Sequence, residues 1–144
     1  MESSQMGRVL VEMTVESVED LWAARKGELP ADKVRKVVIP DALVDTGAST
    51  IALPTSVIQQ LGLKKVKERP VRVATGTGTV SVYDVVQFTI MGREGKLEVI
   101  EVPDGNPALI GQLPLEMLCF VVDMKTHRLI GDPFTGGEHI IDLL

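Results

Sequence analysis

Apolar and polar residues alternate along much of this chain, a pattern that is typical of half-buried β-strands. Residues 8–16 alternate in part and predict a first strand, and residues 34–45 predict a second. Because proline cannot donate to a strand ladder, Pro40 predicts an edge or a bulge within the second strand. Two further hairpins are predicted, with strands at residues 85–91 and 96–102 around Gly92–Gly95, and at 119–123 and 128–131. The pattern therefore predicts a mostly β fold.

Valines alternate on both sides of another turn region, Thr75-Gly76-Thr77-Gly78-Thr79. Such runs around glycine predict a hairpin whose tip is Gly76–Gly78. A glycine-rich loop after a strand can also bind phosphate in a nucleotide site. That alternative fails because no third glycine or Lys-Ser/Thr follows, and the next segment is a predicted strand, which offers no helix N-terminus to an anion.

Two short helices are also predicted. The run Ser17-Val18-Glu19-Asp20 matches a capping box and predicts the start of a helix, which Gly27 and Pro30 close. The second helix is predicted over residues 54–61, with proline at its first position and Gly62 just past its end.

The composition agrees with one compact domain. With 144 residues, the chain can bury a core without disulfides or a metal. Hydrophobic residues make up 44% and aromatic residues 3%, so the core consists mainly of aliphatic side chains, which favour strands. We expect one domain over residues 6–144, preceded by a flexible tail over residues 1–5.

Charge and cysteine content exclude several classes of protein. The net charge of −5 argues against a general nucleic-acid-binding protein. The lone Cys119 cannot form an intrachain disulfide, and no signal peptide or membrane span is recognisable, so we expect a cytoplasmic location and no membrane partner. Cys119 is expected to be a buried, apolar thiol. His127 and His139 lie in no metal-ligand spacing, so we expect neither a metal nor a cofactor.

One local exception to the acidic balance is a basic run. Such runs are usually solvated faces, and we expect the same here. A site for an acidic partner remains the alternative. The residues of this run are Lys64, Lys65, Lys67, Arg69 and Arg72.

The clearest candidate for a catalytic group lies in the segment Leu43-Val44-Asp45-Thr46-Gly47-Ala48-Ser49-Thr50. A carboxylate at the end of an apolar strand, followed by a glycine that lets the backbone turn, places a titratable group at the mouth of a cleft. Asp-Thr-Gly also occurs as an ordinary turn. A second segment, Ala108-Leu109-Ile110-Gly111, weighs against that interpretation.

Asp45-Thr46-Gly47, the glycine-tipped hairpin and Ala108–Gly111, in this order, resemble the retropepsin-like aspartic proteases, single-domain enzymes of retroviruses with related cellular forms. The resemblance covers roughly residues 6–132, and residues 17–34 are an insertion relative to a minimal member. It implies the acid protease fold, a closed β-barrel with a flap hairpin and two or three short helices. One of these helices is implied over residues 113–118, shortly after Gly111.

The resemblance also implies residue roles. Asp45 is the catalytic acid; the Thr46 hydroxyl bonds across a two-fold axis to the partner loop, and the Gly47 amide keeps the two carboxylates coplanar. Because no other Asp is followed by Thr-Gly or Ser-Gly, a homodimer with the site on its two-fold axis is expected. Residues 138–144 are expected to join the interface. The residues expected to bind substrate are Ala48, Thr75, Gly76, Thr77, Gly78, Ile110 and Gly111.

The implied function is an aspartic endopeptidase acting on a peptide or protein, with water activated between two Asp45 carboxylates that share one proton. Ala48 stands where many two-domain pepsin-like enzymes have a serine, so a hydrogen bond to the ionised form is missing and a mildly acidic optimum, not one below about pH 3, is expected. A non-catalytic, dimeric peptide-binding module of the same fold is the alternative function.

Overall fold

The computed structural model of the chain describes residues 8–141 and 143, so the predicted tail over residues 1–5 lies outside the described residues. Its strands are β1 (Val9–Ser17), β2 (Lys36–Val44), β3 (Ile51–Pro54), β4 (Lys65–Val73), β5 (Gly76–Ile90), β6 (Arg93–Val102), β7 (Leu109–Ile110), β8 (Phe120–Asp123) and β9 (Arg128–Gly131). Its helices are α2 (Val18–Arg25), α3 (Thr55–Leu61) and α4 (Gln112–Met117), with short 3-10 turns η1 (Ala31–Lys33) and η2 (Pro133–Thr135).

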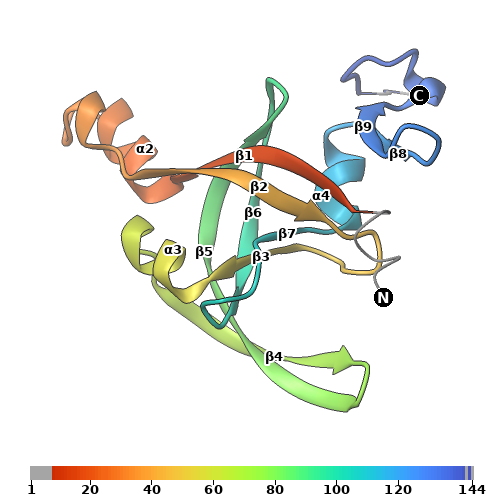
Figure 1. Cartoon of the computed structure of the whole chain (residues 1–144). Helices are drawn as coiled ribbons and strands as arrows, with labels where there is room; N and C mark the ends of the chain where they lie inside the picture. Colours follow the sequence, from red (N-terminus) through yellow and green to blue (C-terminus); the bar gives the residue numbers. More distant parts are fainter. Residues whose placement is uncertain (1–7, 142, 144) are drawn as a thin grey trace.

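Six strands form a closed ring, and a hairpin projects from it (Figure 1). The order is β1-β2-β7-β3-β6-β5, and β5 pairs with β1 to close the ring. β4 pairs with the first part of β5 and forms the projecting hairpin, while β8 and β9 make a separate two-stranded sheet. The predicted mostly β architecture, with a closed ring of strands, a flap-like hairpin and short helices, is confirmed.

The core lies inside this ring because alternate residues of each strand point inward. Met13 and Val15 of β1, Ile51 of β3, Phe88 of β5 and Ile110 of β7 are fully buried there. The buried faces of α3 and α4 belong to the same cluster. Aliphatic side chains therefore hold the ring together, with Phe88 as one of its few aromatic members.

The predicted irregularity at Pro40 is a bulge inside the ring. The register between β1 and β2 pairs Val11 with Ala42 and then Met13 with Ile39, so two residues of β2 lie opposite one residue of β1. The bulge accommodates Pro40, which has no N–H group to give to the ladder.

Two hairpin turns lie elsewhere than the sequence predicted. The turn between β5 and β6 is Met91–Gly92 and not residues 92–95, and the φ angles of 49° and 82° suit a two-residue type I′ turn. The projecting hairpin turns at residues 74–75, whereas Gly76–Gly78, the predicted tip, already belongs to β5. The alternating pattern predicted these strands correctly, but the pairing register decides where the chain turns.

The insertion at residues 17–34 contains α2, which the predicted cap begins. The Ser17 Oγ accepts a hydrogen bond from the Asp20 amide at 3.1 Å. Asp20 is almost fully buried, and its Oδ2 and Oδ1 accept from Nε and Nη2 of Arg35 at 2.8 and 2.9 Å. This bidentate ion pair ties α2 to the residue directly before β2.

We expect Asp20→Asn to lower the free energy of unfolding by about 2 kcal/mol near neutral pH, because Arg35 loses its charged acceptor. Hydrogen bonds from the Arg35 side chain lower the pKa of Asp20 below 3.8, against the opposing effect of burial. The ion pair therefore stabilises the fold above that pH and ceases to do so as the pH falls through the lowered value.

Urea denaturation at a series of pH values measures this effect. The difference between wild type and Asp20→Asn should shrink below pH 3.8. Asp32→Asn, at an exposed position of η1, is the matched control and should leave stability unchanged. A difference for Asp20→Asn that persists undiminished to about pH 2 would contradict the role of the ion pair.

Candidate active site

Asp45 lies directly after the last residue of β2, and β7 holds it in place. The amide of Leu43 donates to the carbonyl oxygen of Ala108 at 2.8 Å, and the amide of Asp45 donates to that of Ile110 at 2.9 Å. Asp45 therefore extends the ladder between β2 and β7 by one residue. The structure brings together the two segments that the sequence analysis singled out.

The Asp45 carboxylate is oriented from within its own loop. The Gly47 amide donates to Oδ1 at 3.0 Å, and the Ala48 amide donates to the main-chain oxygen of Asp45 at 3.0 Å. A Cβ on Gly47 would lie 3.2 Å from the same Oδ1, so glycine lets the amide approach without crowding. Asp45 is half-buried, while Thr46 and Gly47 are exposed. The loop therefore presents its polar groups to the outside of the chain.

The same loop rests on the residues that lead into α4. The Gly111 amide donates to the Thr50 carbonyl at 2.8 Å, and the Gln112 amide donates to that of Ala48 at 2.9 Å. A Cβ on Gly111 would come within 2.6 Å of the Thr50 oxygen, a distance that real side chains do not show. Only glycine allows this close approach, which fixes the far end of the Asp45 loop.

An apolar row crosses the sheet on the face to which Asp45 points. Alternation along β2 puts the side chains of Asp45 and Leu43 on one face and Val44 on the other. Register partners extend this row from β1 past the Asp45 loop to the base of the projecting hairpin. The apolar row consists of Leu10, Leu43, Leu109, Ala52, Ile100 and Val82, each opposite the next.

Ile110 and its neighbour Leu109 point to opposite faces of the sheet. The sequence analysis expected Ile110 to contact substrate, but this side chain is fully buried in the core. Its contribution to the site is the carbonyl that accepts from the Asp45 amide. Leu109, which is half-buried, is the accessible side chain of this pair.

The projecting hairpin contains four of the residues expected to bind substrate, Thr75, Gly76, Thr77 and Gly78. Thr75 lies in the turn, the other three begin β5, and all four are exposed. On one face of the hairpin, Val71 lies opposite Gly78 and Val73 opposite Gly76. Because glycine has no side chain, the main chain of β5 is open on this apolar face.

A polar cluster holds the base of the hairpin. Glu101 of β6 accepts from Thr55 Oγ1 at 2.7 Å and from the Tyr83 hydroxyl at 3.2 Å, so one carboxylate joins β6, α3 and β5. Both hairpin strands are irregular beside this cluster, directly after Lys65 in β4 and after Tyr83 in β5. The hairpin therefore leaves the ring at a point that side-chain hydrogen bonds define.

Two other expectations concern residues away from Asp45. Cys119 was predicted to be buried, but it is only half-buried, because it makes the turn between α4 and β8 with a φ of 59°.

The basic run behaves as a solvated face. Three of its side chains lie on the surface and pair with glutamates: Lys64, Lys65 and Lys67. The described residues contain no cluster of three or more potential metal ligands, and no helix among them is long and apolar enough to span a membrane.

A profile of the aspartyl protease family matches residues 33–112, more than half of the chain. The chain belongs to the aspartyl protease family. The matched part of this aspartyl protease contains the Asp45 loop, the projecting hairpin and Gly111. Among solved structures, it is similar to the solution structure of the simian foamy virus (mac) protease, with 19% identity over 75% of this chain and 94% of that chain, at a TM-score of 0.45. A comparison with curated proteins finds no match.

The sequence analysis missed the apolar row and the polar cluster of this aspartyl protease. Each member of the row is an apolar residue within a strand, and the alternation along a strand shows which residues share a face. Which members become neighbours depends on the register between strands that are distant in sequence. Glu101 and Tyr83 gave no signal, because neither belongs to a recognisable motif.

We expect Gly111→Ala to lower the free energy of unfolding by about 3 kcal/mol or more, because its Cβ would overlap main-chain atoms of Ser49 and Thr50. Denaturant midpoints measure this. Gly78→Ala is the matched control, since its Cβ would meet only the Val71 side chain at 3.8 Å, an ordinary contact. Equal stability of the two variants would contradict the close approach at Gly111.

Tyr83 is the only tyrosine, so ultraviolet titration of phenolate reports it alone. Burial, followed by the hydrogen bond to Glu101, raises the pKa of Tyr83 above 10.0. We expect the midpoint of wild type to lie above 10.0 and that of Glu101→Gln to fall towards it, because a negative neighbour is removed. Glu98→Gln, at another position of β6, should leave it unchanged. Identical midpoints in all three proteins would exclude the Tyr83–Glu101 contact.

Proposed function

We propose that this aspartyl protease is an endopeptidase that works as a homodimer, with one Asp45 from each copy in a shared site on a two-fold axis. The observation that supports this proposal is the state of Asp45 in the single chain. Its carboxylate is half-buried and oriented by the Gly47 amide at 3.0 Å, and the exposed Thr46 lies beside it. One chain supplies one such carboxylate, so a second copy would complete the pair.

Peptide hydrolysis at this site requires an acid and a base at the same time. Two carboxylates that face each other closely cannot both ionise without a large cost, so the pair holds one proton. The ionised Asp45 takes a proton from a bound water molecule, whose oxygen attacks the scissile carbonyl carbon. The protonated Asp45 donates its proton to the carbonyl oxygen.

The second half of the reaction returns the pair to its starting state. The C–N bond of the tetrahedral intermediate breaks, the leaving nitrogen takes a proton from one carboxyl, and the other carboxylate recovers the proton of the newly formed hydroxyl. No covalent bond to the enzyme forms, and we expect no cofactor. Because Ala48 has no hydroxyl that could donate to the ionised Asp45 carboxylate, we expect a mildly acidic pH optimum for cleavage.

The substrate class that we propose is a peptide bound in extended form, with apolar side chains near the scissile bond. The apolar row lies on the same face as Asp45, and its members that are not buried would receive such side chains, with Leu109 in place of Ile110. These members are Leu10, Leu43, Leu109 and Ile100. The hairpin residues 75–78 would close over the peptide, and the open main chain at Gly76 and Gly78 would bond to its backbone.

The remaining roles follow the expected pattern. Thr46 is exposed, so its hydroxyl is free to bond to the partner's loop and to hold the two carboxylates in register. Ala48 and Gly111 would line the site beside Asp45. We also expect the enzyme to act in the cytoplasm, where the lone Cys119 would stay reduced.

Cleavage of a diverse peptide mixture tests this proposal. We expect Asp45→Asn to lower kcat/KM by at least about a thousandfold, because the dyad loses its shared proton and its base. Asp41→Asn, which removes an exposed carboxylate of β2 near the site, is the control and should retain wild-type activity.

Dilution provides the second arm of the experiment. If two copies share the site, the activity per chain should fall as the enzyme is diluted through its dissociation constant. A wild-type dimer that cuts no peptide, or an Asp45→Asn enzyme as active as wild type, would overturn the proposal. The non-catalytic, peptide-binding dimer would then take its place.

A further inference from the structure

Two arginines of the basic run have no part in the contacts described so far. Arg69 and Arg72 lie on β4, and both are exposed. The three lysines of the run each pair with a glutamate, whereas neither arginine forms an ion pair with another described residue. Within the described part of the chain, the charges of these two side chains are therefore not balanced by a paired carboxylate.

The pairing register puts the two arginines on opposite faces of the projecting hairpin. Arg69 lies opposite Val80, and Arg72 lies opposite Thr77. Because side chains alternate along a strand, Arg69 shares its face with Val71, and Arg72 belongs to the other face. The two positions are alike in residue type and exposure but differ in the surface to which they belong.

The face of the hairpin that carries Arg69 continues the face to which Asp45 points. Val82, the end of the apolar row, is the register partner of Lys67, and Arg69 is the second residue after Lys67. An ion pair agrees with this placement, because Lys67 Nζ lies 3.5 Å from Oε1 of Glu98, which precedes a β6 member of the row by two positions. Lys67 is thus paired on this face, and Arg69 has no such partner among the described residues.

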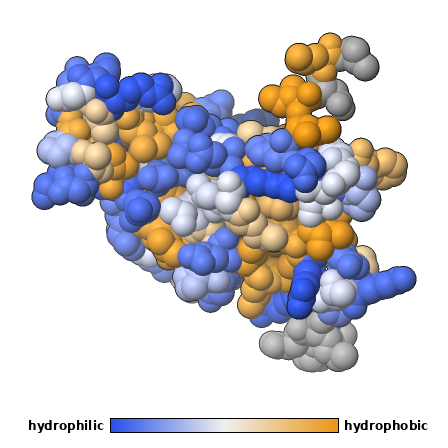
Figure 2. Space-filling model, turned by 90° about the horizontal axis from the view of Figure 1, so that it is seen from above, coloured by the Kyte–Doolittle hydropathy of each residue, from blue (hydrophilic) through white to orange (hydrophobic). Residues whose placement is uncertain are grey.

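The arrangement of the elements leaves this face open. The loop between β2 and β3, which contains Asp45, and the end of the β4–β5 hairpin both extend to the right in Figure 1. Figure 2 views the molecule from the side opposite the hairpin, where apolar side chains stand out at the C-terminal end and Ile141 and Leu143 are exposed. If that end joins the dimer interface as expected, dimerisation leaves Arg69 accessible.

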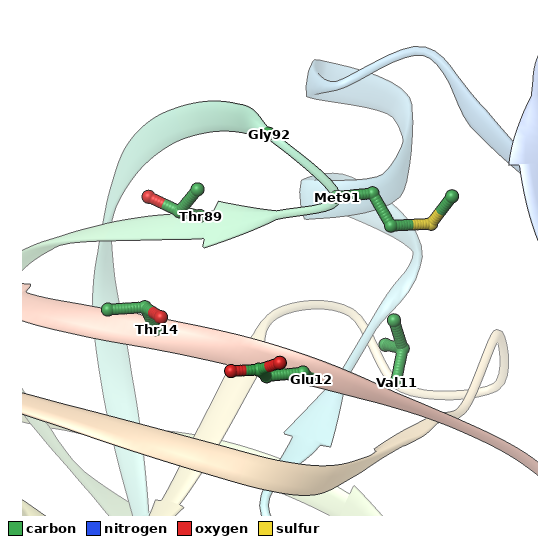
Figure 3. Close-up of a pocket in the computed structure, with 6 residues that line it drawn as sticks. All are labelled: Val11, Glu12, Thr14, Thr89, Met91 and Gly92. Atoms are coloured by element: carbon green, nitrogen blue, oxygen red, sulfur yellow. The ribbon is translucent and has the colours of Figure 1, made fainter.

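The other end of β5 differs in charge. A shallow hollow of about 290 Å³ lies there beside β1 and the turn at Met91–Gly92 (Figure 3). Among the described residues that line this hollow, only Glu12 is charged. The hollow therefore offers an acidic ligand no cationic partner, in contrast to the hairpin.

We propose that Arg69 selects substrates by binding the carboxylate of an aspartate or glutamate side chain in the peptide. This inference rests on the proposed function and narrows its substrate class: apolar side chains lie near the scissile bond, and an acidic side chain lies farther along the peptide. Arginine suits this role because its planar guanidinium can donate two parallel hydrogen bonds to a carboxylate.

The surroundings of Arg69 on the hairpin support such a bond. Its register partner Val80 and its neighbour on the same face, Val71, are both half-buried apolar side chains. When the hairpin closes over a peptide, water is displaced from this face, and a charge pair is screened less than in open solvent. An extended peptide presents alternate side chains to one face, so a peptide on the apolar row can also present an acidic side chain to Arg69.

The cut sites in a diverse peptide mixture, identified by mass spectrometry, test this selection. We expect wild type to prefer Asp or Glu at one fixed position relative to the scissile bond, Arg69→Gln to lose this preference, and Arg69→Glu to prefer Lys or Arg there. Arg72→Gln is the matched control, because it removes the same charge from the other face, and it should keep the acidic preference. An acidic preference that survives in Arg69→Gln, or is absent from wild type, would overturn the inference.

Steady-state kinetics on one preferred peptide measure the size of the effect. Because Arg69 would bind a part of the substrate away from the reacting carbonyl, it should act on KM and leave kcat almost unchanged. Replacing the acidic residue of the peptide by its amide should raise KM about five- to tenfold for wild type and not at all for Arg69→Gln. An equal rise for both enzymes would show that Arg69 does not bind this carboxylate.

Peptide retention without catalysis separates selection by Arg69 from the proposed function. The Asp45→Asn protein is immobilised, with or without Arg69→Gln or Arg72→Gln, and the peptides that it retains from the uncut mixture are identified. If wild type cuts nothing but acidic peptides are retained and Arg69→Gln alone abolishes their retention, the proposed function fails and selection by Arg69 stands. If wild type cuts peptides as a dimer without an acidic preference, selection by Arg69 fails and the proposed function stands.

Discussion

The candidate site depends on the close approach of β7 and Gly111 to the loop that contains Asp45. β7 has only two residues, yet it pairs with β2 in parallel and with β3 in antiparallel fashion, so it joins the two ends of that loop. The amide of Asp45 bonds to β7, and the Gly111 amide bonds to Thr50. A side chain at position 111 would push these segments apart. The loop is therefore as rigid as the sheet that supports it.

The closed ring explains how a chain of modest size can hold this loop in place. Ring closure leaves few free strand edges, and a core of aliphatic side chains fills its interior. Within the described part of the chain, free edges remain on the projecting β4–β5 hairpin, on β1 before its pairing with β5 begins at Thr14, and on the separate β8–β9 sheet. Under the proposed function, the hairpin would offer its free backbone groups to a bound peptide. We infer that the closed ring supports the Asp45 loop, whereas these edges provide backbone groups that are still free to bind.

Much of this architecture could be predicted from the sequence, because the informative patterns are local. The Ser17 cap, the bulge at Pro40 and the Asp45 loop each follow from a few neighbouring residues. The turns at Met91–Gly92 and at residues 74–75 were misplaced, because glycine marks a turn region whereas long-range pairing fixes the turn itself. The orientation of Ile110 and the formation of the apolar row depend on register between distant strands, which a single sequence does not show.

The central claim is that two copies contribute one Asp45 each to a single active site. Co-refolding wild type with increasing fractions of Asp45→Asn, at a fixed total concentration well above the dissociation constant, tests it most directly. If both carboxylates are needed, activity falls with the square of the wild-type fraction, to about one quarter in an equal mixture. A linear fall, to about one half, would show that each chain acts alone and would contradict the claim.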